Sequence, residues 1–329
     1  MPEDVLIQEE DTLHDNGAQK DMGLKPEPSS TSLPSDFNPL LAAVKKWGRW
    51  VLEEARKELA AFYRSSDPDE TIVGYIWART LPCQNPACGA EIPLIRQFWL
   101  ARKKDREIAL HPVVREGRVD FEVVARGKKA IGAQHAAAET QYAPWPSGFD
   151  PKHGTVARAV VTCPVCGGTI SANDTRRLFQ EGKAGQRMVA EVFTLAGQTG
   201  KFYRLPTQAD LEAYMAAERA LAEKRQRLAQ AWGMDPVPDE PLRRVPVVFG
   251  VINVWIYGMT TWGDLFNPRQ QLALITFAKK VRQAHAAMLA QGYPEDFARA
   301  VVTYLSLVFS RHSSYNATLC WWEPLGERS

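Results

Sequence analysis

The feature that most constrains the fold is a set of four cysteines arranged as two close pairs. Cys83 and Cys88 have four residues between them, and Cys163 and Cys166 have two. A glycine follows each pair and permits the tight turn on which backbone amides point at sulfur. Four thiolates held on two such turns form a closed tetrahedral zinc site. The sequence therefore predicts a structural zinc ion bound by these four cysteines.

The sequence alone leaves other roles open for these cysteines. Four reduced thiols could be small apolar residues of a core, or a pair could form a redox-active disulfide. A catalytic zinc is disfavoured, because catalytic sites keep an open position and usually recruit histidine or carboxylate. His111, His135 and His153 lie between the pairs, and any of them could replace a cysteine ligand. The fifth cysteine, Cys320, lies in an apolar stretch and is predicted to be buried.

The segment around the pairs, residues 71–205, is predicted to be a β-rich module. Its β-branched and aromatic runs are separated by glycine and proline, as is typical of strands. These runs are residues 71–77, 107–114, 119–124, 155–162 and 188–195. Residues 196–202 have the wrong spacing for a phosphate-binding loop, so we expect a hairpin turn there. The zinc site would thus be a zinc ribbon with a long β insertion.

Helical patterns flank this module. Apolar residues recur at helical spacing over residues 40–63, after Asp36 or Asn38 as a possible N-cap. Three further helices are expected at residues 207–232, 267–290 and 294–315, and a strand at residues 247–256. Residues 1–35 lack periodicity and are rich in polar residues and proline, so we expect a disordered tail.

Composition and charge narrow the function classes. The 329 residues are 45% hydrophobic and 24% charged, which is ordinary for a globular protein. There is no apolar run of about 18 residues and no cationic start, so neither a membrane span nor a secretory signal is predicted. Sparse, paired cysteines favour a reducing cytoplasm. Residues 1–28 hold eight acids and two lysines, which leaves a net charge of +8 on the remainder. Such a charge is compatible with a nucleic-acid partner and equally with an ordinary basic surface.

Two aromatic segments are candidate nucleic-acid or substrate contacts. Residues 257–270 contain Trp262, Asp264 and Arg269 and precede a helix whose N-terminus could hold an anion. Tyr315 and Asn316 follow the last expected helix, and Asn316 could contact a base edge or cap that helix. The alternative for the first segment is an aromatic staple that fixes the start of the helix. Basic doublets beside aromatic residues could contact phosphate or could simply be solvated.

Several of these stretches together resemble the middle of large bacterial and archaeal DNA methylases. These are adenine-specific-like proteins, found in some anti-phage loci, that carry a zinc ribbon inserted into a Rossmann-type methyltransferase. The matching stretches are residues 36–39, 77–94, 162–168, 257–270 and 315–321. The resemblance follows the family order from about residue 36 to the end of the sequence. It implies that Asp36 and Asn38 lie near the cofactor, S-adenosylmethionine.

Two motifs of that family are missing from this sequence. Its members have a glycine-rich turn for S-adenosylmethionine before the Asp-x-Asn-Pro element, where this chain has its polar tail. They also have an Asp-Pro-Pro-Tyr motif for the flipped base, and this sequence has no Pro-Pro dipeptide. The expected fold is therefore α+β, with partial Rossmann-type elements at residues 36–70 and 206–329 and the β-rich zinc-ribbon module between them.

The functional expectation follows from these matches and departures. The chain is predicted to be a fragment or split subunit of a DNA methyltransferase, inactive alone and acting in zinc-stabilised DNA recognition. One alternative is an active methyltransferase assembled in trans with a partner chain that carries the missing motifs. Another is a truncated remnant without function.

Overall fold

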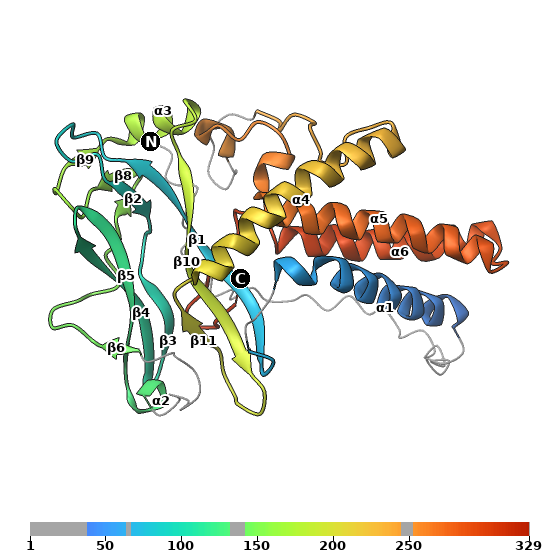
Figure 1. Ribbon diagram of the computed structural model, residues 1–329, viewed down its shortest axis with the longest axis horizontal. Coiled ribbons are helices and arrows are strands. Elements are labelled where there is room, and N and C mark those ends of the chain that lie inside the picture. Colours follow the sequence, from blue (N-terminus) through green and yellow to red (C-terminus); the bar gives the residue numbers. More distant parts are fainter. Residues whose placement is uncertain (1–37, 64–66, 132–141, 245–252, 329) are drawn as a thin grey trace, which may run out of the picture.

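The computed structural model describes residues 38–63, 67–131, 142–244 and 253–328. It is a mixed α+β structure in which the strands gather at one end and long helices project from the other (Figure 1). The expected α+β class is confirmed at this level. Within the described ranges, no helix is both long enough and apolar enough to cross a membrane.

Three sheets make up the β-rich part. The first has the order β11 (Phe202–Arg204), β10 (Gly185–Leu195), β1 (Glu70–Pro82), β2 (Glu91–Leu94). The second has the order β3 (Trp99–Lys103), β4 (Arg106–Arg115), β5 (Arg118–Arg126), β6 (Ala143–Pro144). The third, smallest sheet has the order β7 (Val156–Ala157), β8 (Val160–Thr162), β9 (Thr169–Ile170). Two short helices, α2 (Lys128–Ile131) and α3 (Ala172–Gln180), lie in this part.

The longest strand pairing joins residues far apart in the sequence. β1 and β10 run antiparallel, with Glu70 opposite Leu195 and Thr80 opposite Gly185. β10 and β11 are also antiparallel, so the loop between them is the expected hairpin turn. The pairings in the three sheets are antiparallel except for β5 with β6, which pair in parallel over two residues.

The first two sheets share one apolar core. Ala190 and Tyr203 come from the first sheet, and Leu100, Ile108 and Phe121 come from the second. All five side chains are buried. This shared core fixes the two sheets relative to each other, so that the loop after β1 lies at a defined place at the upper end of the β-rich part (Figure 1).

Four long helices form where the sequence predicts them. They are α1 (Pro39–Leu59), α4 (Gln208–Trp232), α5 (Pro268–Ala290) and α6 (Glu295–Ser314). The Asn38 side chain accepts hydrogen bonds from the amides of Leu40 and Leu41, at 3.1 and 3.2 Å. Capping boxes begin α4 at Thr207 and α5 at Asn267. These local caps satisfy the amides that the first helical turn leaves free.

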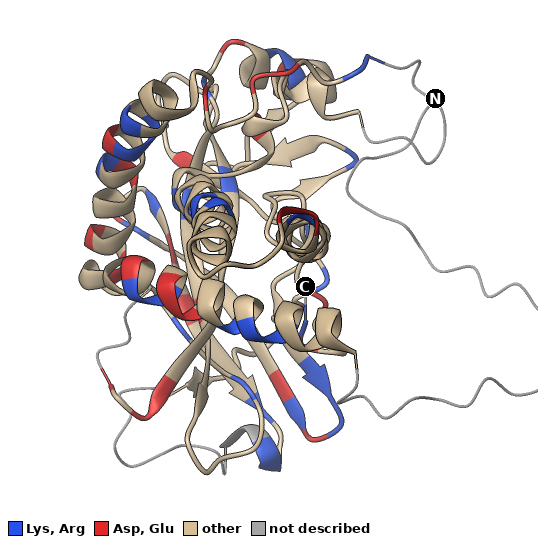
Figure 2. Ribbon diagram, turned by 90° about the vertical axis from the view of Figure 1, so that its right-hand side faces the viewer, with Lys and Arg blue, Asp and Glu red and all other residues tan. Residues whose placement is uncertain are grey.

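The helices pack through apolar seams and a partly buried ionic cluster. Glu58 of α1 accepts from Lys224 of α4 at 2.6 Å and pairs with Lys280 of α5 at 2.9 Å. Lys279 approaches the same carboxylate at 3.5 Å. Seen from the helical side, both acidic and basic residues lie along the helices (Figure 2). The cluster therefore joins three helices at one carboxylate.

The last described residues, 322–328, form a C-terminal strap against the β-rich part. The Trp322 indole donates to the carbonyl of Leu100 at 2.6 Å. Glu327 is buried, and its carboxylate accepts hydrogen bonds from Lys103, Arg106 and Tyr203. The strap thus brings the end of the sequence back to β3, β4 and β11.

Two of the expected strands differ from the observed structure. Residues 155–162, predicted as one strand, form the hairpin of β7 and β8. The chain turns at Arg158 and Ala159, which both have positive φ. Arginine and alanine rarely adopt this conformation, so the sequence does not predict a turn there. The expected strand at 247–256 falls partly outside the described residues, and its described end is the 3₁₀ helix η3 (Val254–Tyr257). The predicted tail at residues 1–35 lies wholly outside them.

Candidate metal centre

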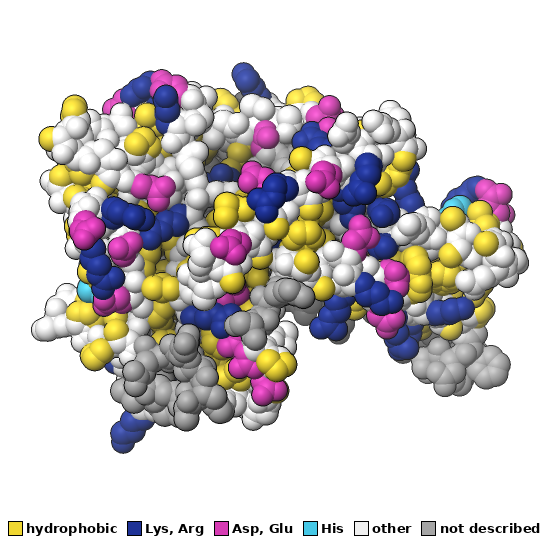
Figure 3. Space-filling model, viewed as in Figure 1, with side chains coloured by type: hydrophobic (Ala, Val, Ile, Leu, Met, Phe, Trp, Pro, Cys, Tyr) yellow, Lys and Arg dark blue, Asp and Glu magenta, His cyan; other side chains and the backbone are white. Residues whose placement is uncertain are grey.

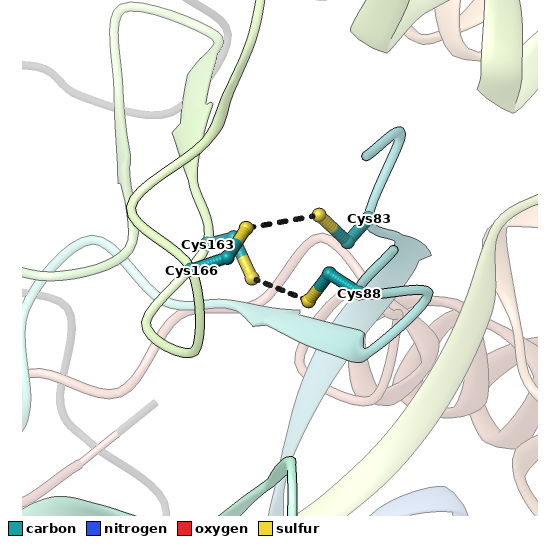
Figure 4. A group of neighbouring side chains, drawn as sticks. All are labelled: Cys83, Cys88, Cys163 and Cys166. Carbon is teal, nitrogen blue, oxygen red and sulfur yellow. Dashed lines mark hydrogen bonds between the residues drawn. The ribbon is translucent and has the colours of Figure 1, made fainter. Parts of the chain in front are cut away.

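The four cysteines predicted as zinc ligands meet at one point. Their sulfur atoms all lie within 4.8 Å of one another. Cys83 and Cys166 are 3.6 Å apart and Cys88 and Cys163 are 3.9 Å apart, sulfur to sulfur (Figure 4). A tetrahedron with zinc–sulfur bonds of about 2.3 Å has edges of about 3.8 Å. The spacing therefore fits a four-thiolate zinc ion, and it is far longer than the roughly 2 Å of a disulfide bond.

The first two ligands lie on the turn between β1 and β2. The Cys83 amide donates to the carbonyl of Ala90 at 2.8 Å and closes the hairpin. The Asn85 carbonyl accepts from the amides of Cys88 and Gly89, at 2.9 and 3.1 Å. Gly89 has a φ of +58°, a conformation that favours glycine. The turn holds both sulfur atoms on one side of the hairpin.

The other two ligands lie on the turn between β8 and β9. The Cys163 amide donates to the carbonyl of Gly168 at 2.8 Å, and the Gly167 amide donates to the carbonyl of Cys163 at 2.9 Å. The Gly168 amide points at the sulfur of Cys166, at 3.4 Å. Amides aimed at sulfur stabilise a thiolate. The two cysteine turns are thus built alike, although their spacings in the sequence differ.

A backbone latch holds the two turns together. The amides of Gly154 and Thr155 donate to the carbonyls of Arg96 and Ile95, at 2.9 and 2.7 Å. The Thr155 hydroxyl accepts from the Ile95 amide at 2.9 Å. A Cβ on Gly154 would lie 1.9 Å from the Ile95 carbonyl oxygen, so only glycine fits there. The latch ties the chain before β7 to the chain after β2, and the second turn therefore faces the first.

Beneath the sulfur atoms lies a small apolar core. Leu81 and Ile92 come from β1 and β2, Val161 and Ile170 from β8 and β9, and Leu178 from α3. Cys83 and Cys163 are themselves buried, whereas Cys166 is exposed. The centre is therefore closed on its inner side by hydrocarbon and reaches solvent at Cys166 and, in part, at Cys88.

The thiols differ in acidity. Burial raises the pKa of the Cys83 thiol to about 12, whereas the Gly168 amide lowers the pKa of the Cys166 thiol to about 7. In the absence of metal, Cys166 is therefore more easily ionised than Cys83. A divalent cation placed among the four sulfur atoms would favour all four thiolates and would release protons as it binds.

The histidines do not replace a cysteine ligand in the described structure. His111 stacks edge-on against Phe149 at 4.7 Å. His153 is exposed and lies 3.3 Å from Asp150. His135 lies outside the described residues. Cys320, predicted to be buried, is instead partly exposed, and its thiol donates to the Ser314 carbonyl at 3.1 Å.

The two aromatic segments predicted as nucleic-acid contacts come together beside β1. The amide and the hydroxyl of Thr318 both donate to the carbonyl of Leu265, at 2.7 and 2.9 Å. Arg79 of β1 donates to the Thr318 hydroxyl at 3.5 Å. The side chains singled out in these segments nevertheless have mostly internal partners.

Arg269 is the clearest example, because its side chain is buried and not available to bind an anion at the start of α5. Its side chain is buried and lies 3.6 Å from the centre of the Tyr75 ring. Tyr63 and Tyr214 surround the same guanidinium at 5.2 and 5.6 Å. Asp264 accepts from the amides of Thr260 and Thr261 and so caps a turn. The proposed helix-end anion site is therefore not formed by Arg269 in this structure.

Two of the remaining side chains predicted as contacts are more exposed to solvent. Trp262 and Tyr315 are each 52% exposed. Asn316 donates to the His312 carbonyl at 2.9 Å, which is the capping role that the sequence left open. Asn38 caps α1, and Asp36, the other residue expected near a cofactor, lies outside the described residues. Of the described side chains singled out from the sequence as contacts, Trp262 and Tyr315 are thus the ones that offer exposed aromatic surface.

Comparison with known proteins adds no relatives: no protein-family description, no curated protein and no solved structure matches this chain.

Proposed function

We propose that the chain is a zinc-stabilised DNA-binding component of a DNA methyltransferase, without methyl transfer of its own. The observation that carries the proposal is the four-thiolate cluster, whose sulfur spacing matches a closed zinc shell. A closed shell leaves no position for substrate or water, so the metal has a structural role. In this proposal the two cysteine turns form a zinc ribbon within partial Rossmann-type elements.

DNA is the proposed partner for reasons of charge and surface. Beyond residue 28 the chain has a net charge of +8, which favours contact with phosphates. Trp262 and Tyr315 are half exposed, and aromatic side chains of this kind stack on bases. The methyltransferase context rests on the sequence resemblance. A cytoplasmic location is part of the same proposal.

The proposal is tested by binding of a fluorescent 20-base-pair duplex to zinc-loaded protein at several salt concentrations. We expect affinity that falls steeply between about 50 and 200 mM salt. Trp262→Ala should weaken binding about tenfold, because base stacking contributes about 1–3 kcal/mol. Leu52→Ala, which also removes an exposed apolar side chain but from α1, is the matched control and should change nothing. No binding at about 50 mM salt would refute the proposed function.

A second candidate is an active enzyme assembled with a partner chain that supplies the glycine-rich turn and the Asp-Pro-Pro-Tyr motif. One observation favours it: Tyr304, Leu307 and Val308 on α6 are 51%, 62% and 64% exposed. Such a cluster is typical of a surface that another chain covers. Calorimetry with S-adenosylmethionine, with and without the products of adjacent genes, separates the candidates. Binding that requires a partner would support the assembled enzyme.

A further inference from the structure

The β-rich part has a basic hollow at the end where β3 turns into β4. The hollow has a volume of about 510 Å³, and its lining includes five cations and two carboxylates. The cations are Arg102, Lys103, Lys104, Arg106 and Arg126. Lysines of α2, the short helix at this end of the molecule, add to them. Basic atoms protrude at the lower end of the β-rich part (Figure 3).

The hollow is shaped by a close contact of two backbone turns. Gly127 has a φ of +98°, and a Cβ there would lie 2.4 Å from the carbonyl oxygen of Asp105. The same carbonyl accepts a hydrogen bond from the Lys129 amide at 2.9 Å. The turn after β3 and the start of α2 are therefore fixed against each other. The walls of the hollow belong to paired strands and to this contact.

Three of its cations are positioned by partners within the protein. Lys103 and Arg106 pair with the buried carboxylate of Glu327 in the C-terminal strap. Arg126 pairs with Glu107 and lies 4.3 Å from the centre of the Trp145 ring. These contacts hold the three cations in place and pair the lining carboxylate of Glu107, whereas the other lining carboxylate, Asp105, is exposed and forms no ion pair with the described residues.

Two of the lining cations, Arg102 and Lys104, remain without a carboxylate. Both are exposed, and neither forms an ion pair with any residue that the structure describes. The Arg102 guanidinium lies over the Trp99 ring, 5.8 Å from its centre. Lys128 and Lys129 are exposed beside them and are likewise unpaired within the described residues. The hollow thus combines fixed walls with cations that can accept an external anion.

We infer that this hollow binds the phosphate groups of a nucleic-acid strand. Lysine and arginine side chains are hydrogen-bond donors only, so the ligand must supply acceptors and negative charge. Phosphate oxygens do both, and arginine binds them through two parallel hydrogen bonds. The cations extend from the β3–β4 turn to α2, which suits a chain of phosphates better than one isolated ion. The inference rests on the proposed function, since it names where the DNA backbone would lie.

The test compares Arg102→Ala, Lys104→Ala with the wild-type protein in the duplex-binding assay. Both residues are exposed and unpaired, so the double variant should fold normally, as far-ultraviolet circular dichroism would report. Loss of two phosphate contacts should reduce the slope of log affinity against log salt by about 1.8 and weaken binding at least tenfold at 50 mM salt. The matched control is Lys45→Ala, Arg49→Ala on the exposed side of α1, which should retain the wild-type slope.

Each outcome decides something different. An unchanged slope in the double variant, with wild-type DNA binding intact, overturns the inference and leaves the proposed function standing. Equal losses in the double variant and the α1 control also overturn it, because the effect would then be one of overall charge. A wild-type protein that fails to bind DNA refutes both. Competition by tripolyphosphate at concentrations where inorganic phosphate has no effect is the expected sign of a multi-phosphate site, and equal competition by phosphate would contradict it.

Discussion

The helical part and the β-rich part reach their structures by different means. In the helical part, α1, α4 and α5 each begin at a side-chain cap, and the helices meet through apolar seams and the Glu58 cluster. In the β-rich part, the pairing of β1 with β10 joins residues more than 100 positions apart. Its smallest sheet has strands of only two or three residues. Three strands this short bury little apolar surface by themselves, so a metal cross-link has most to contribute there.

The largest expected effect comes from removing the metal ligands of the second cysteine turn. In Cys163→Ser, Cys166→Ser we expect loss of metal and unfolding of β7, β8 and β9, because structural zinc contributes on the order of 10 kcal/mol to such domains. Hydrogen exchange should show rapid amide exchange in these strands, with α1, α5 and α6 still protected. Cys320→Ser is the matched control. Equal protection in the double variant and the wild type would show that the β-rich part does not depend on metal.

A smaller effect is expected at the C-terminal strap. Glu327→Gln removes the charge that Lys103, Arg106 and Tyr203 contact, and its side chain is only 4% exposed. Loss of one partner of a buried ion pair costs about 3 kcal/mol or more, because the other charge stays buried. Urea unfolding should report this loss. Glu181→Gln, in an exposed pair with Arg177 on α3, should cost under about 0.5 kcal/mol. Similar values for the two variants would contradict a buried role for the strap.

The helical counterpart is Glu58→Gln, for which we expect a loss of about 2 kcal/mol, since the carboxylate is partly exposed. Burial raises the pKa of Glu58, but hydrogen bonds from Lys224 and Lys280 outweigh it and lower the pKa to about 2. The carboxylate's contribution is therefore complete above its unfolded pKa of about 4.5 and is lost as the pH falls towards 2.

Unfolding free energies measured from pH 6 to pH 2.5 check the sign of this effect. The difference between wild type and Glu58→Gln should shrink as the pH falls below about 4.5. Glu53→Gln, exposed on the same helix, should follow the wild-type curve. A difference that stays constant with pH would show that the ionic cluster does not stabilise the helices.

The same contrast explains how much the sequence could predict. The long helices and their caps at Asn38, Thr207 and Asn267 depend on residues within one or two turns, so local patterns found them. The four cysteines were found because ligand spacing is itself a local signal. The metal centre's position in the fold depends on more than that spacing.

The features that were missed depend on distant residues. The latch at Gly154 is required by the carbonyl of Ile95, and nothing near Gly154 in the sequence reveals that contact. Arg269 was expected at an anion site, but tyrosines from three other parts of the chain enclose it. Glu327 is one of two acids in the last seven residues of the sequence, and its burial follows from the docking of the strap. Tertiary contacts of this kind leave no periodic pattern.

The most direct test of the account is the metal content and ligand set of the purified protein. Elemental analysis together with X-ray absorption at the zinc edge should give one zinc per chain, bound by four sulfur atoms at about 2.3 Å. A fully folded, metal-free protein would contradict the account, and so would a zinc shell containing nitrogen or oxygen.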